Sequence, residues 1–178
     1  PAREDLEQAL RLTPNDPSSL AVLAVLELGQ GSVDLAHSHV RTALAQAPDA
    51  AAPLIALGHL LKATGDLAGA RTALRRATAS APLNPLAWSN LAELELANGN
   101  SDAATQAAAH ALGLEPDLAH AHAVLGFTWL AQLDDARAMA SFEAAVERDP
   151  EWALPRLGLG LALIKRGDVN AGREQLER

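Results

Sequence analysis

The sequence of 178 residues has no cysteine and no tyrosine, and it contains only one methionine, two phenylalanines and three tryptophans. The absence of cysteine excludes disulfides, thiolate nucleophiles and Cys-type zinc sites, and it leaves cytosol and periplasm equally open as compartments. With so few aromatic residues and so many Ala and Leu residues, which favour helices, a β-sheet is poorly supplied with the side chains it prefers. The composition therefore indicates an all-α protein.

Positive charge is also scarce, because 14 Lys and Arg face 22 Asp and Glu for a net charge of −8. Nucleic acids and anionic membranes need clustered basic side chains, so we expect neither as a partner. The one tight basic cluster, Arg71, Arg75 and Arg76, is interpreted as a solvated helix face. No apolar run reaches the roughly 18 residues of a membrane span, so we expect no direct membrane insertion.

Prolines and small residues recur with a 34-residue period along the whole chain, and we call each set of residues spaced 34 apart a column. Three of these columns are Pro14, Pro48, Pro82, Pro116 and Pro150; Ala9, Ala43, Ala77, Ala111 and Ala145; and Ala24, Gly58, Ala92, Gly126 and Gly160. Within each unit the apolar spacing predicts two helices, separated by a turn glycine and an N-cap residue. The N-cap column holds Ser32, Asp66, Asn100, Asp134 and Asp168.

The phase of the repeat predicts the organisation of the chain as one domain. Residues 1–16 are the second helix of a truncated unit, the full units are 17–50, 51–84, 85–118 and 119–152, and 153–178 is a truncated final unit. We therefore expect eleven helices. We also expect both ends to be cuts in a longer array, because no polar capping helix is evident.

The repeat resembles the tetratricopeptide repeat family. The third unit carries the pattern as Trp88, Leu91, Ala92, Gly99, Ala104, Ala111 and Pro116, and the fourth as Leu125, Gly126, Trp129, Ala138, Phe142, Ala145 and Pro150. The resemblance covers the chain and implies an all-α, right-handed superhelical solenoid of antiparallel helix pairs. Glu27 and Glu95 depart from it where an aromatic residue is preferred, and Leu133 replaces a turn glycine.

No pattern predicts catalysis, a metal or a cofactor. The chain has no G-x-S-x-G motif, and its close histidine pairs, His37 with His39 and His120 with His122, are two residues apart and diverge on a helix. We therefore expect no enzyme in this chain. A catalytic domain elsewhere in a longer parent protein remains an open alternative.

In the family resembled, the face of each first helix opposite the core lines a concave groove that binds peptides. The corresponding positions are Ala21, Val25 and Leu28; Ile55, His59 and Lys62; Ser89, Glu93 and Leu96; Ala123, Phe127 and Leu130; and Leu157, Leu161 and Ile164. Eleven of these fifteen are apolar, whereas a solvent-facing stripe should be polar. Asn90 is added as the lone candidate for the Lys–Asn set that grips C-terminal carboxylates in some members, a set otherwise missing here.

These observations predict a protein-interaction scaffold that binds an apolar or amphipathic peptide segment in its groove. Two alternatives stay open. Neighbouring repeats bury the apolar stripe, or the chain self-associates into homo-oligomers through its groove or its ends. The identity of the partner and the compartment are not determined, and the richness in Ala and Leu is compatible with a bacterial source.

Overall fold

The computed structural model describes the backbone of residues 2–177 and the side chains of Leu6 and of residues 8–177. Within this range the chain forms eleven α-helices and no strand, which confirms the predicted fold class and helix number. The helices are α1 Ala2–Leu12, α2 Pro17–Gly29, α3 Val33–Gln46, α4 Ala51–Ala63, α5 Leu67–Ser80, α6 Pro85–Ala97, α7 Ser101–Leu114, α8 Ala119–Ala131, α9 Asp135–Arg148, α10 Ala153–Arg166 and α11 Val169–Glu177.

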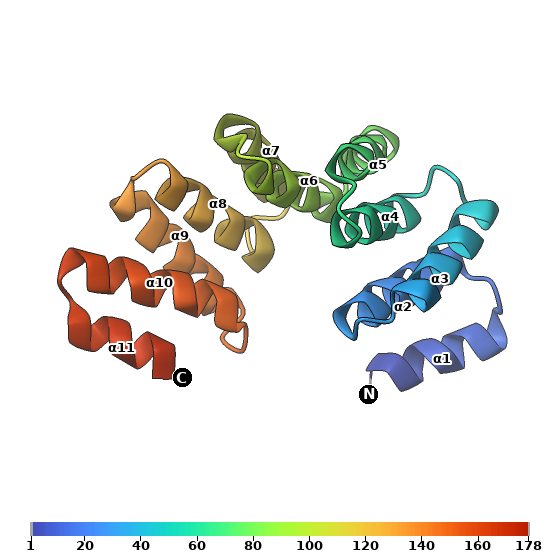
Figure 1. The fold of residues 1–178 in the computed structure, drawn as a ribbon, viewed down its shortest axis with the longest axis horizontal. Coiled ribbons are helices and arrows are strands. Elements are labelled where there is room, and N and C mark those ends of the chain that lie inside the picture. The colour runs from blue at the N-terminus through green and yellow to red at the C-terminus, as the bar shows by residue number, and fades with distance from the viewer. Residues whose placement is uncertain (1, 178) are drawn as a thin grey trace. The chain divides into compact units, whose positions relative to one another are not determined.

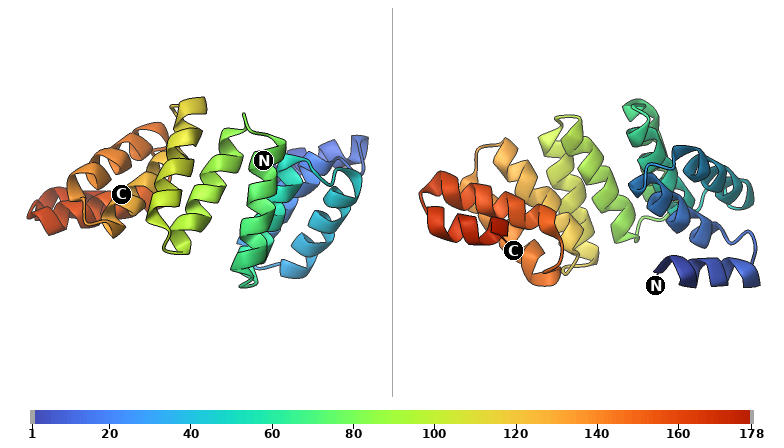
Figure 2. Two further views of the ribbon diagram at one scale, coloured as in Figure 1. Left: turned by 90° about the horizontal axis from the view of Figure 1, so that it is seen from above. Right: turned by 60° about the horizontal axis from the view of Figure 1, so that its bottom comes forward.

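The chain divides into two compact units between Asn90 and Leu91, within α6. In the first unit α2 pairs with α3 and α4 pairs with α5, and α4 also packs on α2 (Figure 1). In the second unit α8 pairs with α9 and α10 pairs with α11, and α10 also packs on α9 and α8. Figure 2 shows these pairs from two further sides. Each unit therefore builds its core between stacked helix pairs.

The first unit is held together by small residues that face leucines. Its core includes Ala24, Ala36 and Leu60 in one cluster, and Leu54 with Ala77 in another. At Gly58 of α4 an added Cβ would lie 2.7 Å from Cγ of Leu74 on α5. A side chain there would overpack the crossing of the two helices, so the small-residue column sets how closely they approach.

The core of the second unit is centred on Phe142 of α9, which is fully buried. Its ring lies against Gly126 of α8 and Gly158 of α10, where an added Cβ would come within 2.5 Å of ring carbons in both cases. Leu159, Leu163 and Met139 pack in the same cluster. Because the ring of Phe142 fills the space above both glycines, α8, α9 and α10 pack closely against one another. This packing positions the face described below.

Turns between paired helices use the left-handed backbone region. Gly31, Gly65, Gly99 and Gly167 have φ between 76° and 102°, which glycine adopts without steric cost. Leu133 occupies the corresponding place between α8 and α9 with φ of 62°. Leu133 therefore keeps the turn geometry although it departs from the family pattern. Its backbone is strained as a result.

Four of the five predicted N-cap residues divide into two groups. Asp66 and Asp134 each accept a hydrogen bond from the backbone N–H three residues on, and Asp16 does the same before α2. The N–H of Arg137 lowers the pKa of Asp134, and the N–H of Ser19 lowers that of Asp16, because both bonds favour the ionised carboxylate.

Ser32 and Asn100 also precede helices, but their side chains make no cap bond. The amide of Asn100 instead donates to Oε2 of the buried Glu95 at 2.8 Å. The Asn100 amide therefore satisfies one oxygen of Glu95, whose carboxylate stands where the family pattern prefers an aromatic residue.

In three repeats, the side chain at one position of the first helix contacts the turn that precedes that helix. Nε1 of Trp88 donates to the carbonyl oxygen of Pro82 at 2.8 Å, and Nε2 of His122 lies 2.9 Å from that of Pro116. The guanidinium of Arg156 likewise donates to the carbonyl oxygen of Pro150. Trp88, His122 and Arg156 occupy the same position in successive repeats. Each contact fixes how its helix leaves the turn.

Candidate functional site

A cleft of about 120 Å³ opens in the second unit between the C-terminal half of α6, the middle of α8 and the start of α10. It is lined by Glu93, Leu96, His120, Ala123, Val124, Phe127, Trp152 and Leu154. Ala123 and Val124 are buried and form the floor, whereas Leu154 is 46 % exposed at the rim. The cleft therefore joins a closed apolar floor to an accessible apolar edge.

One corner of the cleft is polar and aromatic. Oε2 of Glu93 on α6 lies 3.1 Å from Nε2 of His120 on α8, and both side chains are partly exposed. The ring centroid of His120 is 5.9 Å from that of Trp152, with a tilt of 55° between the planes. The contact between Glu93 and His120 and the ring contact link α6, α8 and the turn before α10 around this corner.

Phe127 belongs both to the cleft and to the core. Its ring meets Phe142 edge-to-face, with centroids 4.8 Å apart and planes at 73°, an arrangement that aromatic pairs prefer. Leu130, one turn further along α8, is partly buried in the same cluster. Of these two predicted partner-binding residues, only Phe127 lines the cleft, and its position is fixed by the core beneath it.

The apolar face continues along α10 beyond the cleft. Leu154, Leu157 and Leu161 are three and four residues apart, so they share one side of the helix. Leu157 is 45 % exposed and Leu161 is 51 % exposed, while Ile164 is partly buried. The predicted stripe on this helix is therefore an exposed row of leucines that adjoins the cleft through Leu154.

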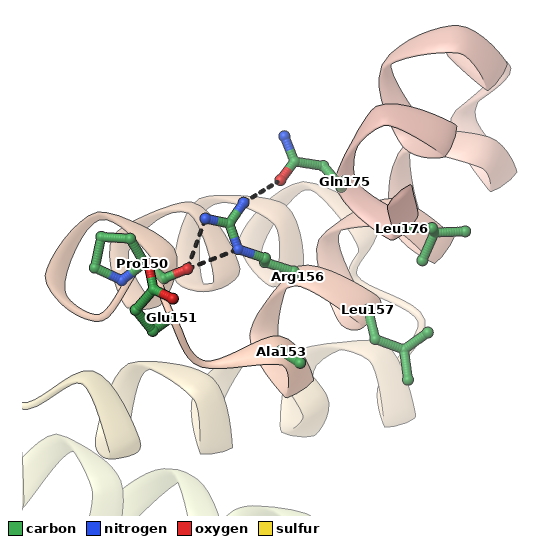
Figure 3. Close-up of a pocket in the computed structure, with 7 residues that line it drawn as sticks. All are labelled: Pro150, Glu151, Ala153, Arg156, Leu157, Gln175 and Leu176. Atoms are coloured by element: carbon green, nitrogen blue, oxygen red, sulfur yellow. Dashed lines mark hydrogen bonds between the residues drawn. The ribbon is translucent and has the colours of Figure 1, made fainter. Parts of the chain in front are cut away.

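A second cavity, of about 240 Å³, lies between α10 and α11 and has Leu157 in its lining (Figure 3). It is lined by Pro150, Glu151, Ala153, Arg156, Leu157, Gln175 and Leu176. The guanidinium of Arg156 crosses it to the carbonyl oxygen of Pro150 and to Oε1 of Gln175. Its charged group is thus engaged in holding the turn before α10.

The predicted positions on α2 and α4 belong to the first unit. Val25 is 37 % exposed and Leu28 packs against the core cluster of α2 and α4. Ile55 packs against the second cluster, and His59 and Lys62 are partly buried along α4. These side chains present less exposed apolar surface than the leucines of α10.

Two predicted partner-binding residues of α6 are buried instead. Ser89 is fully buried and Asn90 is 9 % exposed. The hydroxyl of Ser89 and the amide of Asn90 both donate to the carbonyl oxygen of Leu86, one turn earlier in the same helix. Both side chains thus satisfy the backbone of their own helix, and neither offers a polar surface to a partner.

Sequence reasoning missed four residues that line the cleft: His120, Val124, Trp152 and Leu154. His120 and Leu154 lie one turn before Ala123 and Leu157, so extending each predicted stripe by one turn would have included them. Trp152 precedes α10 as its N-cap residue, where helical periodicity carries no information. Only the packing of the turn against α8 brings its ring to His120.

Among the side chains that the structure describes, no three His, Asp or Glu residues lie close enough together to hold a metal ion. None of the helices α1 to α11 is both long enough and apolar enough to cross a lipid bilayer.

Comparison with known proteins gives two matches to tetratricopeptide repeat profiles, over residues 27–94 and residues 2–51. Together they span just over half of the chain. No curated protein sequence matches it.

Solved structures extend the likeness to nearly the full length. A thermophilic TPR protein of Thermus thermophilus matches with a TM-score of 0.77 and 25 % identity, covering 89 % of this chain and 87 % of that one. The pilF protein of Pseudomonas aeruginosa matches at 0.75 and 20 %, covering 98 % and 75 %. A chain of the APC/C Cut9–Hcn1 hetero-tetramer matches at 0.84 and 17 %, covering 98 % and 36 %.

The last two likenesses show the fold alone. Combined with the profile matches and the stacked helix pairs, they confirm the resemblance read from the repeats. The chain belongs to the tetratricopeptide repeat family, whose members generally serve as scaffolds for protein–protein interaction.

Proposed function

We propose that the second unit binds an apolar or amphipathic segment of a partner protein in the cleft between α6, α8 and α10. The observation that carries this proposal is the convergence of Leu96, Phe127 and Leu154, from three helices, on one accessible cleft. A surface that only met water would be expected to carry polar side chains at these positions. The row of Leu157 and Leu161 extends the apolar surface along α10.

The size of the cleft suits one anchoring side chain. Its volume of about 120 Å³ equals roughly four molecules of liquid water, which is the scale of a single Leu, Ile or Phe side chain. Burying such a side chain contributes about 1.5–3 kcal/mol. An anchor of this kind with further contacts along α10 would give specific binding of a short segment.

Self-association is the second candidate function, and the exposed leucines of α10 favour it. Leu157 and Leu161 together offer an apolar surface to which a second copy could apply the same helix face. A symmetric pairing through α10 would be isologous, with each leucine row covering the other. In this case the cleft would be part of a homodimer interface.

The experiment that tests the proposal is selection of a displayed peptide library, tiled across a proteome, on the purified protein. The variants are Leu154→Asp in the cleft and Leu161→Asp on α10. The control is Leu133→Asp, which makes the same change at a more exposed leucine in a turn of the same unit, outside the cleft. Phe127 is unsuitable, because a charge there would also remove the contact with Phe142 in the core.

Peptides enriched on the wild-type protein and on the control, but lost on Leu154→Asp, would support the cleft as the binding site. Enrichment that survives Leu154→Asp would overturn it. If no peptide is enriched, and if the molar mass in light scattering doubles with concentration and falls to that of a monomer in Leu161→Asp, self-association replaces peptide binding as the function.

A further inference from the structure

We infer that the segment bound in this cleft is cationic, with a Lys or Arg side chain beside its apolar anchor that contacts Glu93 and Trp152. The inference rests on the proposed function, and it adds the charge and the arrangement of the partner's side chains. It is drawn from the polar corner of the cleft, from the composition of its lining and from the charge of the second unit.

The carboxylate of Glu93 is placed to receive such a cation. Its side chain is 37 % exposed and lines the cleft while Oε2 lies 3.1 Å from Nε2 of His120. A carboxylate offers about four acceptor sites on its two oxygens, so several donors can share it. An ammonium or guanidinium group entering the cleft would meet an accessible negative charge at its wall.

Trp152 supplies the second half of the corner. Its indole lies next to His120, and the ring lines the same cleft as Glu93. Cations are attracted to the face of an indole within about 6 Å of its centroid. The second unit already uses this contact in its own structure, since the guanidinium carbon of Arg137 lies 3.7 Å from the ring centroid of Trp129.

The composition of the cleft disfavours an anionic partner. None of its eight lining residues is Lys or Arg, and its one imidazole, His120, already contacts Glu93, so an acidic side chain or a C-terminal carboxylate would find no ammonium or guanidinium group there. Beyond the cleft, residues 91–178 hold 14 Asp and Glu against 7 Lys and Arg, which is nearly all of the net charge of the chain. This excess attracts basic segments over a longer range and accelerates their association.

These features define the occupant as a basic amphipathic segment. The anchor occupies the apolar floor formed by Ala123 and Val124, and the cation reaches the corner of Glu93 and Trp152. In a helical segment, side chains three or four residues apart lie on the same face. A Lys or Arg three or four residues from a bulky apolar residue therefore matches the cleft, and acidic residues at that distance do not.

The test uses a displayed library of fully randomised short peptides, selected in parallel on four versions of the protein. These are the wild type, Glu93→Gln, Glu143→Gln and Leu154→Asp. Glu143→Gln is the matched control, because it removes the same charge from the exposed side of α9, outside the cleft. Circular dichroism spectra and thermal midpoints establish that each variant is folded.

We expect peptides selected on the wild type and on Glu143→Gln to show Lys and Arg in excess over Asp and Glu at three or four residues from the anchor. On Glu93→Gln this excess should fall. The affinity of the most enriched peptide, measured by fluorescence polarisation, should fall about twofold to fivefold, which corresponds to a partly exposed ion pair. Replacing its Lys by Gln should make the peptide insensitive to Glu93→Gln.

Should Glu93→Gln be unfolded, Trp152→Leu takes its place, because it keeps an apolar side chain and removes the aromatic face. The inference is overturned if selected peptides require Leu154 but carry no basic excess, or carry the same excess on the wild type and on the corner variants. In that outcome the proposed function stands. Peptides that bind Leu154→Asp equally well, or no enrichment on the wild type, would remove the proposed function and the inference together.

Discussion

Leu133 has a left-handed backbone conformation, with a positive φ, that otherwise occurs at turn glycines. Among residues 2–177, it is the only residue other than glycine with a positive φ, and its side chain is 78 % exposed. The equivalent turn positions hold Gly65 and Gly99. Leu133→Gly should therefore raise the free energy of unfolding, since the change relieves a strained backbone and sacrifices little buried surface.

The size of the effect follows from two opposing contributions. Placing a side chain in the left-handed region costs about 1–2 kcal/mol. Glycine gives back about 0.4–1 kcal/mol, because it increases the conformational freedom of the unfolded chain. The net gain is about 1 kcal/mol, or about 2–4 °C in thermal midpoint for a chain of this length.

Leu83 provides the matched control for the assay. It lies in the turn between α5 and α6, it is 79 % exposed, and its φ is not positive. Leu83→Gly makes the same change to the unfolded chain without relieving strain, so it should lower the midpoint in thermal and urea unfolding followed by circular dichroism. The difference between the two variants isolates the backbone strain, about 1–2 kcal/mol. Equal losses of stability in both variants would refute the reasoning.

Three further predictions concern the core, a cap and a turn. Phe142→Ala should lower the free energy of unfolding by about 3–5 kcal/mol in urea titrations, because it leaves a cavity at the centre of the second unit. A loss below about 1 kcal/mol would mean that the helices move together and fill the cavity. The pKa of Asp134 is lowered by the N–H of Arg137, so its contribution to stability is present above the ordinary value of 3.8 and is lost as the pH falls through the lowered pKa. Asp134→Asn should flatten this dependence in thermal unfolding between about pH 6 and pH 2, and an unchanged slope would contradict it. Trp88→Phe removes the donor to Pro82 and should cost about 0.5–1.5 kcal/mol, read from the unfolding of the first unit by hydrogen exchange; undiminished protection would argue against the bond.

The parts of the fold that could be predicted from the sequence are those that repeat. Small residues at Gly58 and Gly126 lie where helices cross, and the repetition of that requirement made the columns visible. The helix number and family followed from these columns, and both are confirmed. The turn at Leu133 could be located because its neighbours in the column are glycines.

The candidate site was predictable only in part, because it depends on how side chains from different repeats meet. Glu93, Leu96 and Phe127 lay on the predicted stripe and line the cleft. Trp152 contributes from outside any helix, where periodicity gives no signal. Ser89 lay on the stripe but is buried, since a short hydroxyl side chain can bond to its own helix and allow the helix to pack closely.

One column of the repeat holds three residues of unrelated type, Trp88, His122 and Arg156, that make the same contact. An aromatic ring, an imidazole and a guanidinium share little in hydropathy or volume, but each places a ring or guanidinium nitrogen at hydrogen-bond distance from the carbonyl oxygen of the proline six residues earlier. That carbonyl lies in a turn where it has no helical partner, and pairing it stabilises the entry to the next helix. The earlier repeats place buried leucines at this position, Leu20 and Leu54. Before Leu54, the carbonyl oxygen of Pro48 instead accepts a hydrogen bond from the guanidinium of Arg76 on α5, so the repeat of residues 51–84 meets the same demand with a side chain from another column. Residue similarity along one column therefore does not identify this contact.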